Sequence, residues 1–202
     1  MLPPNFWDHR YSASDYVYGT DPNDFLAERY SVLASGGDVL CLADGEGRNG
    51  VFLAAQGMHV TSVDSSAVGL AKARRLANER QVKLETVVAD LATWDPGREC
   101  WDGVVSIWAH LPLPIREVLH PRLVRALRPG GILFLEHYHP RQLGYGTGGP
   151  PDPTMMLTLA ELDVAFPGWL RLHGFEGERV VVEGNGHGGK SYVTQAILKK
   201  PS

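Results

Sequence analysis

The stretch VLCLADGEGRNG, Val39–Gly50, decides the fold of this chain. It begins as an apolar run, breaks at a glycine-rich turn and then continues with helix-forming residues. This order is typical of a buried parallel strand, a tight loop and the N-terminus of a helix. Gly45 and Gly47 allow the backbone to turn sharply and a ligand to approach the main chain closely. The helix that follows offers free N–H groups and the positive end of its dipole, which favour an anionic group.

A second feature is an acid about 20 residues after the glycine-rich turn. Asp64 ends the next strand pattern, His59–Asp64. An acid at this position accepts hydrogen bonds from the ribose of a bound nucleotide. The turn and the acid together predict an adenosine-containing cofactor, without deciding which one.

The composition limits the class of protein. The chain has 202 residues and a net charge of −4, and 44% of its residues are hydrophobic. These values predict one globular domain over residues 1–202, with no nucleic-acid-binding surface and no membrane span. The first residues lack the pattern of a signal peptide, and Cys41 and Cys100 are isolated. We therefore expect a cytoplasmic protein with reduced thiols, while its oligomeric state is not indicated.

Strand and helix patterns alternate along most of the chain. They predict an N-terminal aromatic arm and helix over residues 1–35 and a cofactor-binding core over 36–138. A substrate-side loop and helix follow over 139–169, and a C-terminal hairpin over 170–202. The expected fold is a doubly wound α/β sheet with five parallel strands and a final antiparallel pair. The strands are expected at residues 39–43, 59–64, 83–89, 103–108, 132–136, 175–183 and 190–198.

Local signals refine these elements. Asn23 and either Ser65 or Ser66 are expected to cap helices. Pro121 should kink or divide the helix over residues 114–127. The segment Arg128–Gly131 predicts a turn before the fifth strand.

Two segments are candidates for lids. The arm over residues 5–22 is rich in aromatic residues, and we expect Tyr11 and Tyr18 to face the cofactor. Residues 139–155 contain many glycines and prolines, and such long loops are often functional. We expect this loop to close over the substrate.

The order of elements resembles the class I S-adenosylmethionine-dependent methyltransferase fold, a Rossmann-like seven-stranded sheet, mostly parallel, that ends in an antiparallel hairpin. The motifs that carry this resemblance span roughly residues 36–200, and they are Asp44-Gly45-Glu46-Gly47, Asp64, Asp90-Leu91, Trp101–Val105 and Leu127–Gly131. A narrower resemblance is to the small bacterial tellurite-resistance (TehB-like) methyltransferases. It rests on Phe6–Tyr11, Tyr18-Gly19-Thr20, Gly45–Asn49 and His110-Leu111-Pro112.

The resemblance implies S-adenosylmethionine as the cofactor and S-adenosylhomocysteine as its product. It implies that Asp64 binds the ribose hydroxyls, that Asp90 and Leu91 bind the adenine, and that Arg48 lies near the cofactor carboxylate. The full set of implied cofactor-binding residues is Tyr11, Tyr18, Ala43, Asp44, Gly45, Gly47, Arg48, Asn49, Asp64, Ser65, Asp90, Leu91, Ser106 and Ile107. Two positions depart from the family, which usually has an acid at Cys41 and a glycine at Ala43. Asp44 is then a candidate for binding the ammonium group of the cofactor.

Methyl transfer is a displacement at an already activated carbon, so alignment and desolvation can supply most of the rate. A base is needed only for a protonated nucleophile. His110 follows the fourth strand, where open α/β sheets bind ligands, and is the candidate catalytic residue. His137 and His139 share one side of a strand, but no third metal ligand has a recognisable spacing, and we predict no metal.

Three functions remain open from the sequence. The leading one is methyl transfer to a small molecule such as tellurite, selenite, a thiol, a small organic acid or an amine. The second is an NAD-dependent oxidoreductase that uses Gly45, Gly47 and Gly50 as its fingerprint, although no Tyr-x-x-x-Lys pair is present. The third is a protein that binds S-adenosylmethionine without catalysis.

Overall fold

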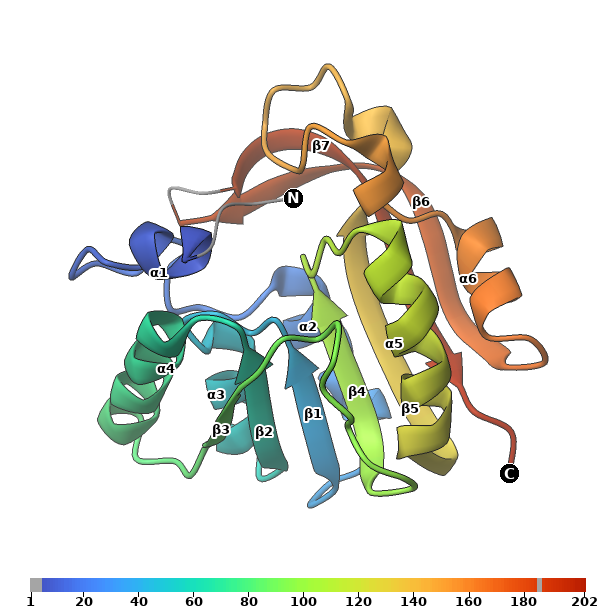
Figure 1. Cartoon of the computed structure of the whole chain (residues 1–202), viewed down its shortest axis with the longest axis horizontal. Coiled ribbons are helices and arrows are strands. Elements are labelled where there is room, and N and C mark those ends of the chain that lie inside the picture. Colours follow the sequence, from blue (N-terminus) through green and yellow to red (C-terminus); the bar gives the residue numbers. More distant parts are fainter. Residues whose placement is uncertain (1–4, 185–186) are drawn as a thin grey trace.

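A seven-stranded sheet with the order β3-β2-β1-β4-β5-β7-β6 forms the centre of the computed structural model (Figure 1). The structure describes residues 5–184 and 187–202. The strand bounds are β1 (Asp38–Leu42), β2 (His59–Asp64), β3 (Glu85–Val88), β4 (Trp101–Ile107), β5 (Leu127–Tyr138), β6 (Leu170–Glu183) and β7 (His187–Lys199).

The direction of the strands confirms the predicted topology. β1 pairs in parallel with both β2 and β4, so that Leu40 lies between Thr61 and Val104. β7 runs antiparallel to both of its neighbours, β5 and β6. The sheet is therefore mostly parallel and ends in an antiparallel hairpin.

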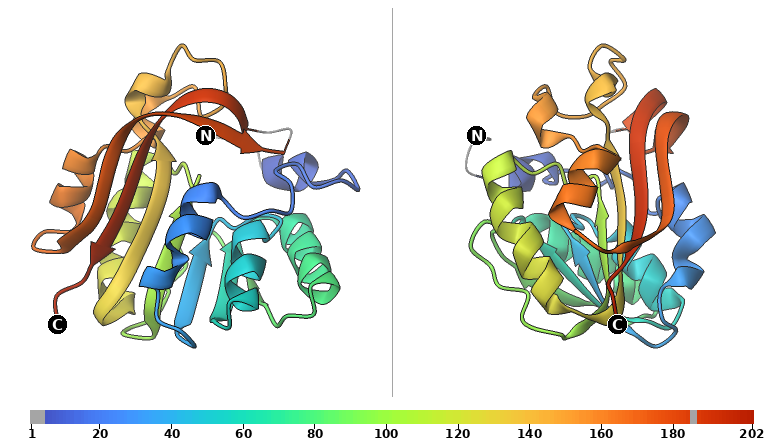
Figure 2. Two further views of the ribbon diagram at one scale, coloured as in Figure 1. Left: turned by 180° about the vertical axis from the view of Figure 1, so that it is seen from behind. Right: turned by 90° about the vertical axis from the view of Figure 1, so that its right-hand side faces the viewer.

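Helices cover both faces of the sheet (Figure 2). α2 (Asp24–Arg29) and α3 (Arg48–Ala55) pack on one face, where Cys41 and Phe134 join an apolar cluster. α5 (Leu113–Ala126) and α6 (Leu159–Ala165) pack on the other face, against Leu42 and Leu135. Neighbouring residues of one strand thus point to opposite faces, which divides the core into two layers.

The predicted helix caps are present. The Asn23 side chain accepts a hydrogen bond from Leu26 N, and Ser66 accepts one from Gly69 N at the start of α4 (Ala67–Glu79). The first of these helices is shorter than expected, because α2 ends at Arg29 and continues as the 3-10 helix η1 (Tyr30–Val32). α5 contains Pro121 but is a single helix, so it is not divided there.

The segment before β5 differs from the prediction. Residues 128–131 belong to β5 rather than to a separate turn. The pairing with β4 nevertheless jumps from Trp101–Leu127 to Gly103–Ile132, and Gly130 has a φ of 76°. The expected turn is therefore present as an irregularity within a continuous strand.

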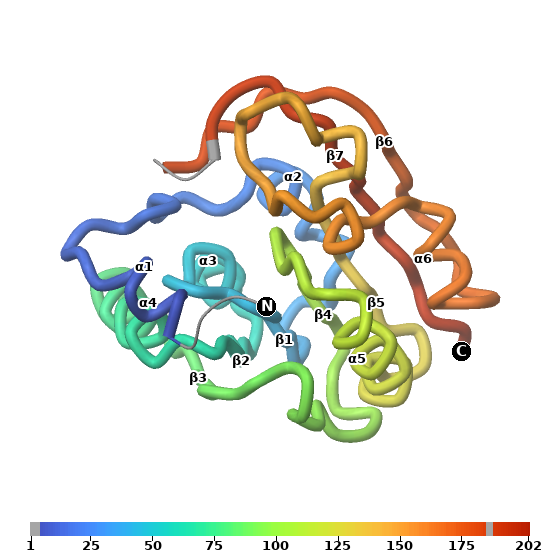
Figure 3. The backbone as a smooth tube through the Cα atoms, turned by 45° about the horizontal axis from the view of Figure 1, so that its top comes forward, coloured from blue at the N-terminus to red at the C-terminus, as the bar shows by residue number. Residues whose placement is uncertain are grey.

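The remaining segments meet near the carboxyl ends of β1 and β4 (Figure 3). They are the arm with α1 (Phe6–Arg10), the loop with η2 (Pro140–Gln142) and η3 (Pro153–Met155), and the hairpin. Both hairpin strands are longer than expected. The predicted turn between them includes residues 185 and 186, which lie outside the described residues. Within the described part of the chain, no helix has the length and apolar character needed to span a membrane.

Candidate functional site

Asp64 connects three elements at the carboxyl edge of the sheet. It ends β2, and its Oδ2 accepts a hydrogen bond from Gly45 N at 2.9 Å while Oδ1 accepts one from Ser66 N at 2.8 Å. Each carboxylate oxygen keeps a further lone pair. The group can therefore accept hydrogen bonds from two vicinal hydroxyls, and a ribose fits this pair of acceptors. Burial raises the pKa of Asp64, while the two backbone N–H groups act in the opposite direction.

Positive φ angles and close packing against α4 constrain the backbone of the glycine loop. Gly45 and Gly47 both have positive φ, at 55° and 85°. A Cβ on Gly47 would lie 2.5 Å from Ala73 Cβ, so this glycine allows the loop to pack against α4. Ala43 also has a positive φ, 49°. Its backbone is strained, because the left-handed region is unfavourable for a residue with a Cβ.

Asp44 lies at the base of the glycine loop. Its Oδ2 accepts a hydrogen bond from Ser62 Oγ at 2.5 Å, and Gly50 N also donates to its carboxyl group. Burial raises the pKa of Asp44 to about 7. The carboxyl group is therefore protonated in a large share of molecules at neutral pH, and contact with the cofactor ammonium stays a prediction.

Tyr11 covers the glycine loop from the arm. Its side chain is only 5% exposed, and a Cβ on Gly45 would lie 2.5 Å from the Tyr11 hydroxyl. The ring also reaches Gly69 at the start of α4. Tyr18 contacts Tyr11 edge to face, with a centroid distance of 6.4 Å. Both predicted aromatic residues thus lie over the candidate cofactor site, and burial raises the pKa of both hydroxyls.

A buried ion pair fastens the arm to the core. Lys72 of α4 pairs with Glu46 of the glycine loop. Lys72 Nζ donates to Asp15 O at 2.6 Å, and Glu46 Oε2 accepts from Val17 N at 2.8 Å. The pair therefore makes the position of the arm depend on the conformation of the glycine loop. Neither residue was predicted from the sequence to hold the arm.

The first two residues of α3, Arg48 and Asn49, contact other segments of the chain. Arg48 forms a 2.6 Å ion pair with Glu183 at the end of β6. Asn49 Oδ1 accepts a hydrogen bond from Asn23 N at 2.9 Å. These contacts show structural roles for Arg48 and Asn49, and their predicted contacts with the cofactor remain untested.

Glu183 and Glu136 form a buried polar network with their neighbours. Asn23 Nδ2 donates to Glu136 at 2.6 Å and to Glu183 at 2.8 Å. Trp108 Nε1 donates to Glu183 at 2.5 Å, and Arg179 pairs with Glu136 at 2.9 Å. The network ties α2, β5 and the hairpin to the end of β4. No short-range pattern in the sequence indicated it, because its members are far apart along the chain.

An aromatic stack follows β4. Trp108 has a positive φ of 55°, an uncommon conformation for a bulky residue and one that is concentrated at functional sites. Its ring stacks on Tyr138 at 4.5 Å, and the Tyr138 ring stacks on His110 at 5.3 Å. His110 Nε2 accepts a hydrogen bond from Tyr138 N at 3.1 Å. A neutral His110 therefore carries its ring proton on Nδ1 in this arrangement.

The other predicted cofactor residues occupy different environments. Ser65 and Asp90 are exposed at the strand ends, and Asp90 Oδ1 accepts from Ala92 N at 2.9 Å. Leu91 and Ile107 are buried. Ser106 is also buried, with its hydroxyl 3.2 Å from His137 Nε2. The edge carrying Asp64, Ser65 and Asp90 thus presents acceptors and a hydroxyl, whereas Ser106 faces the α5 side of the sheet.

His137 in β5 and His139 just after it contact different residues. His137 contacts Ser106, whereas His139 Nδ1 accepts from Arg141 N at 3.0 Å and its ring lies near Tyr192. Among residues 5–184 and 187–202, no group of three possible metal ligands was found.

Comparison with known proteins agrees with this geometry. Residues 39–131 match the methyltransferase domain family. The chain is 35% identical over 115 residues to a trans-aconitate 2-methyltransferase of Paracidovorax citrulli, covering 54% of this chain and 42% of that protein. The chain therefore spans less than half the length of this curated relative.

Two solved structures share the fold. One comes from work on the conversion of a disulfide bond into a thioacetal group during echinomycin biosynthesis. It has a TM-score of 0.77 and 21% identity, over 98% of this chain and 91% of that chain. The other is TehB from Haemophilus influenzae, with a TM-score of 0.73 and 17% identity, over 97% of this chain and 66% of that chain. These structures show that the chain has the fold of the class I S-adenosylmethionine-dependent methyltransferases, and residues 39–131 are similar to the methyltransferase domain.

Proposed function

We propose that the protein transfers the methyl group of S-adenosylmethionine to a small-molecule acceptor in the cytoplasm. The main support is the Asp64 carboxylate, which is held by Gly45 N and Ser66 N with lone pairs left for two hydroxyls. This arrangement suits the ribose of the cofactor. The methyltransferase domain match and the position of β7 in the sheet agree with it.

We assign the remaining cofactor contacts by position. Asp90 and Leu91 follow β3 and would hold the adenine, with Ser65, Ser106 and Ile107 as neighbouring walls. Tyr11 and Tyr18 would cover the glycine loop and exclude water. The bound cofactor would supply a methyl group that is already activated by its sulfonium centre. The protein then has to align the acceptor and remove its water.

His110 is the candidate residue on the acceptor side. It follows β4, and its ring belongs to the stack with Trp108 and Tyr138. We propose that His110 orients the acceptor through its Nδ1–H. It takes a proton from a protonated nucleophile only after Nε2 releases the Tyr138 N–H, because Nδ1 carries the ring proton in the arrangement described. The backbone N–H of Tyr138 fixes the ring by donating to Nε2. The loop over residues 139–155 would close the acceptor side, since Gln142 already joins it to β7 through Tyr192 N at 2.7 Å.

Cofactor binding is tested by thermal unfolding with S-adenosylhomocysteine, S-adenosylmethionine and NADH in parallel. A ligand at 100 times its Kd stabilises a folded protein by about 2.7 kcal/mol, which is a measurable shift. We expect a shift with the first two ligands and none with NADH. Asp64→Asn should weaken the shift strongly, whereas Asp95→Asn, at an exposed carboxylate far along the chain, should leave it unchanged. A shift with NADH alone would refute the proposal in favour of an oxidoreductase.

Catalysis needs a separate assay, because binding alone would also fit a non-catalytic protein. Radiolabelled S-adenosylmethionine should transfer its methyl group to at least one member of a panel of tellurite, selenite, thiols, amines and small organic acids. Small organic acids belong in this panel because the matched relative is a trans-aconitate 2-methyltransferase. Cofactor binding without transfer to any of them would favour the non-catalytic function.

A further inference from the structure

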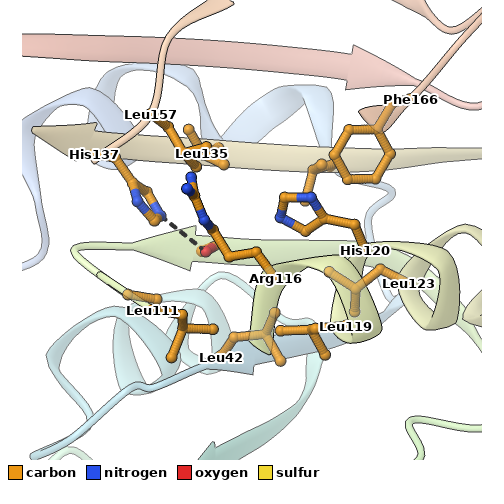
Figure 4. A pocket seen from close by; sticks show the side chains of 13 residues that line it. Leu42, Leu111, Arg116, Leu119, His120, Leu123, Leu135, His137, Leu157 and Phe166 are labelled. Atoms are coloured by element: carbon orange, nitrogen blue, oxygen red, sulfur yellow. Dashed lines mark hydrogen bonds between the residues drawn. The ribbon is translucent and has the colours of Figure 1, made fainter. Parts of the chain in front are cut away.

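A small cavity lies between the sheet and the helices α5 and α6 (Figure 4). Its volume is about 10 Å³, roughly the least that can hold one water molecule. Most of its wall is apolar and contains several leucines. Four polar residues interrupt this wall, and they are Ser106, Arg116, His120 and His137. In Figure 4 the Arg116 side chain lies between the two imidazole rings.

Arg116 is an almost fully buried cation, with 3% of its surface exposed. Its terminal nitrogens donate to Thr154 O at 2.6 Å and to Met156 O at 3.0 Å. Its Nε is buried and has no hydrogen-bond partner among the described residues. The nearest carboxylate, Glu161, is 3.9 Å away, and its side chain is half-exposed. The buried charge is therefore only weakly compensated, which is unfavourable in a protein interior.

His137 supplies a second unpartnered nitrogen. The residue is 2% exposed, and its Nδ1 has no partner within the described part of the chain. Burial lowers the pKa of His137 far enough to keep the ring neutral. When the Ser106 hydroxyl donates to Nε2, the ring proton lies on Nδ1. Arg116 Nε and His137 Nδ1 are then two buried N–H donors in the wall of one cavity.

The other groups around the cavity carry no negative charge. Burial, together with the nearby Arg116, lowers the pKa of His120 to about 4, so its ring is neutral at physiological pH. The leucine wall excludes strongly hydrated ions. A cation would be repelled by Arg116, and a carboxylate or phosphate exceeds the available volume. A monatomic anion satisfies the charge and is the kind of anion that needs the least room.

We propose that this cavity binds one monatomic monovalent anion of the size of chloride, held by Arg116 Nε–H and His137 Nδ1–H. The bound anion compensates the buried guanidinium. Because Arg116 also holds the carbonyl groups of residues 154 and 156, the anion stabilises the attachment of the substrate-side loop to α5. The cavity shares Ser106 with the proposed adenine wall but does not include the glycine loop, and its test does not depend on methyl transfer.

The direct test is a crystal structure of the unmodified protein grown in sodium bromide, with data collected at the bromine absorption edge. We expect an anomalous peak in the cavity next to Arg116 Nε and His137 Nδ1. Peaks confined to the protein surface would mean an adventitious ion only and would overturn the proposal. An empty cavity, or one that holds water, would overturn it equally.

Thermal unfolding gives a second measurement in solution. Sodium chloride or bromide should raise the melting temperature in a saturable way, beyond the effect of sodium gluconate at equal ionic strength. Arg116→Gln should weaken the apparent halide affinity at least about tenfold, since a hydrogen bond from a charged donor is lost. Arg122→Gln is the matched control, because Arg122 lies on the same helix and also donates to two carbonyls, Ala92 O and Trp94 O, but does not line the cavity.

A further variant separates anion binding from the attachment of the loop. His137→Phe keeps the contacts of Arg116 with residues 154 and 156 but removes the Nδ1–H donor. It should also weaken the halide effect, without the loss of loop contacts that Arg116→Gln brings. Equal halide responses in the unmodified protein and in both cavity variants would refute the proposal.

Discussion

The carboxyl group of Asp44 should make the stability of this protein fall with increasing pH. Burial raises its pKa from the ordinary 3.8 to about 7 in the folded state. Between these two values the folded state binds more protons than the unfolded state, so the free energy of unfolding decreases as the pH rises. The contribution is complete below about pH 4 and is lost by about pH 8.

The size of this effect follows from the shift. A difference of about three pKa units corresponds to about 4 kcal/mol, at 1.36 kcal/mol per unit. Only about two of these units fall between pH 5 and pH 8, so we expect about 2–3 kcal/mol over this range, and solvent screening of the partly exposed Asp44 favours the lower end. Asp44→Asn removes the ionisation while keeping an oxygen that can accept from Ser62 Oγ. The variant should therefore gain stability relative to the natural protein as the pH rises.

Urea unfolding followed by tryptophan fluorescence, without cofactor, measures the difference. Other buried groups also titrate in this range, so the quantity of interest is the stability of Asp44→Asn minus that of the natural protein at each pH. Asp95→Asn is the control, because Asp95 is exposed and its pKa is lowered. Above pH 5 the stability of this variant should therefore run parallel to that of the natural protein. Parallel curves for Asp44→Asn, within about 0.5 kcal/mol from pH 5 to pH 8, would refute a pKa near 7.

Two further predictions concern the glycine loop and the arm. Gly47→Ala should destabilise the protein by about 3 kcal/mol in urea unfolding, because its Cβ would meet Ala73 at 2.5 Å. Gly57→Ala, also at positive φ but facing open space, should cost only about 1 kcal/mol, and equal losses would contradict the packing argument. Lys72→Met should cost about 3 kcal/mol and speed limited proteolysis of the arm, since it leaves Glu46 buried without its cation. Unchanged cleavage of the arm would show that Lys72 does not hold it.

The sequence predicted those features that depend on residues close together in the chain. The apolar runs located the strands, because buried parallel strands are apolar throughout. Asn23 and Ser66 were predictable as caps, since a cap bonds an N–H only a few residues ahead. Asp64 was predictable because the glycine loop and the end of the next strand meet at one edge of any doubly wound sheet.

Features that depend on distant partners were not predictable in this way. The orientation of Asp44 depends on Ser62, a neighbour only after β1 and β2 pair. Arg48 was expected near an anionic ligand, but its partner in the structure is Glu183, 2.6 Å away on the hairpin. A positive charge at the start of a helix suits either partner, so the residue type alone cannot distinguish them. The helix over residues 114–127 was expected to kink or divide at Pro121, and the division is wrong, because α5 continues through this residue as one helix.

Two charged residues beside Gly47 connect the glycine loop to the arm and to the hairpin. Glu46 and Arg48 lie on either side of Gly47 and have opposite charges. Glu46 accepts the backbone N–H of Val17 in the arm, whereas Arg48 pairs with Glu183 of the hairpin. A change in the loop backbone therefore acts on two segments that approach the carboxyl edge of the sheet from different parts of the chain (Figure 3). In the proposed function the site must exclude water, and we expect these two contacts to help close it.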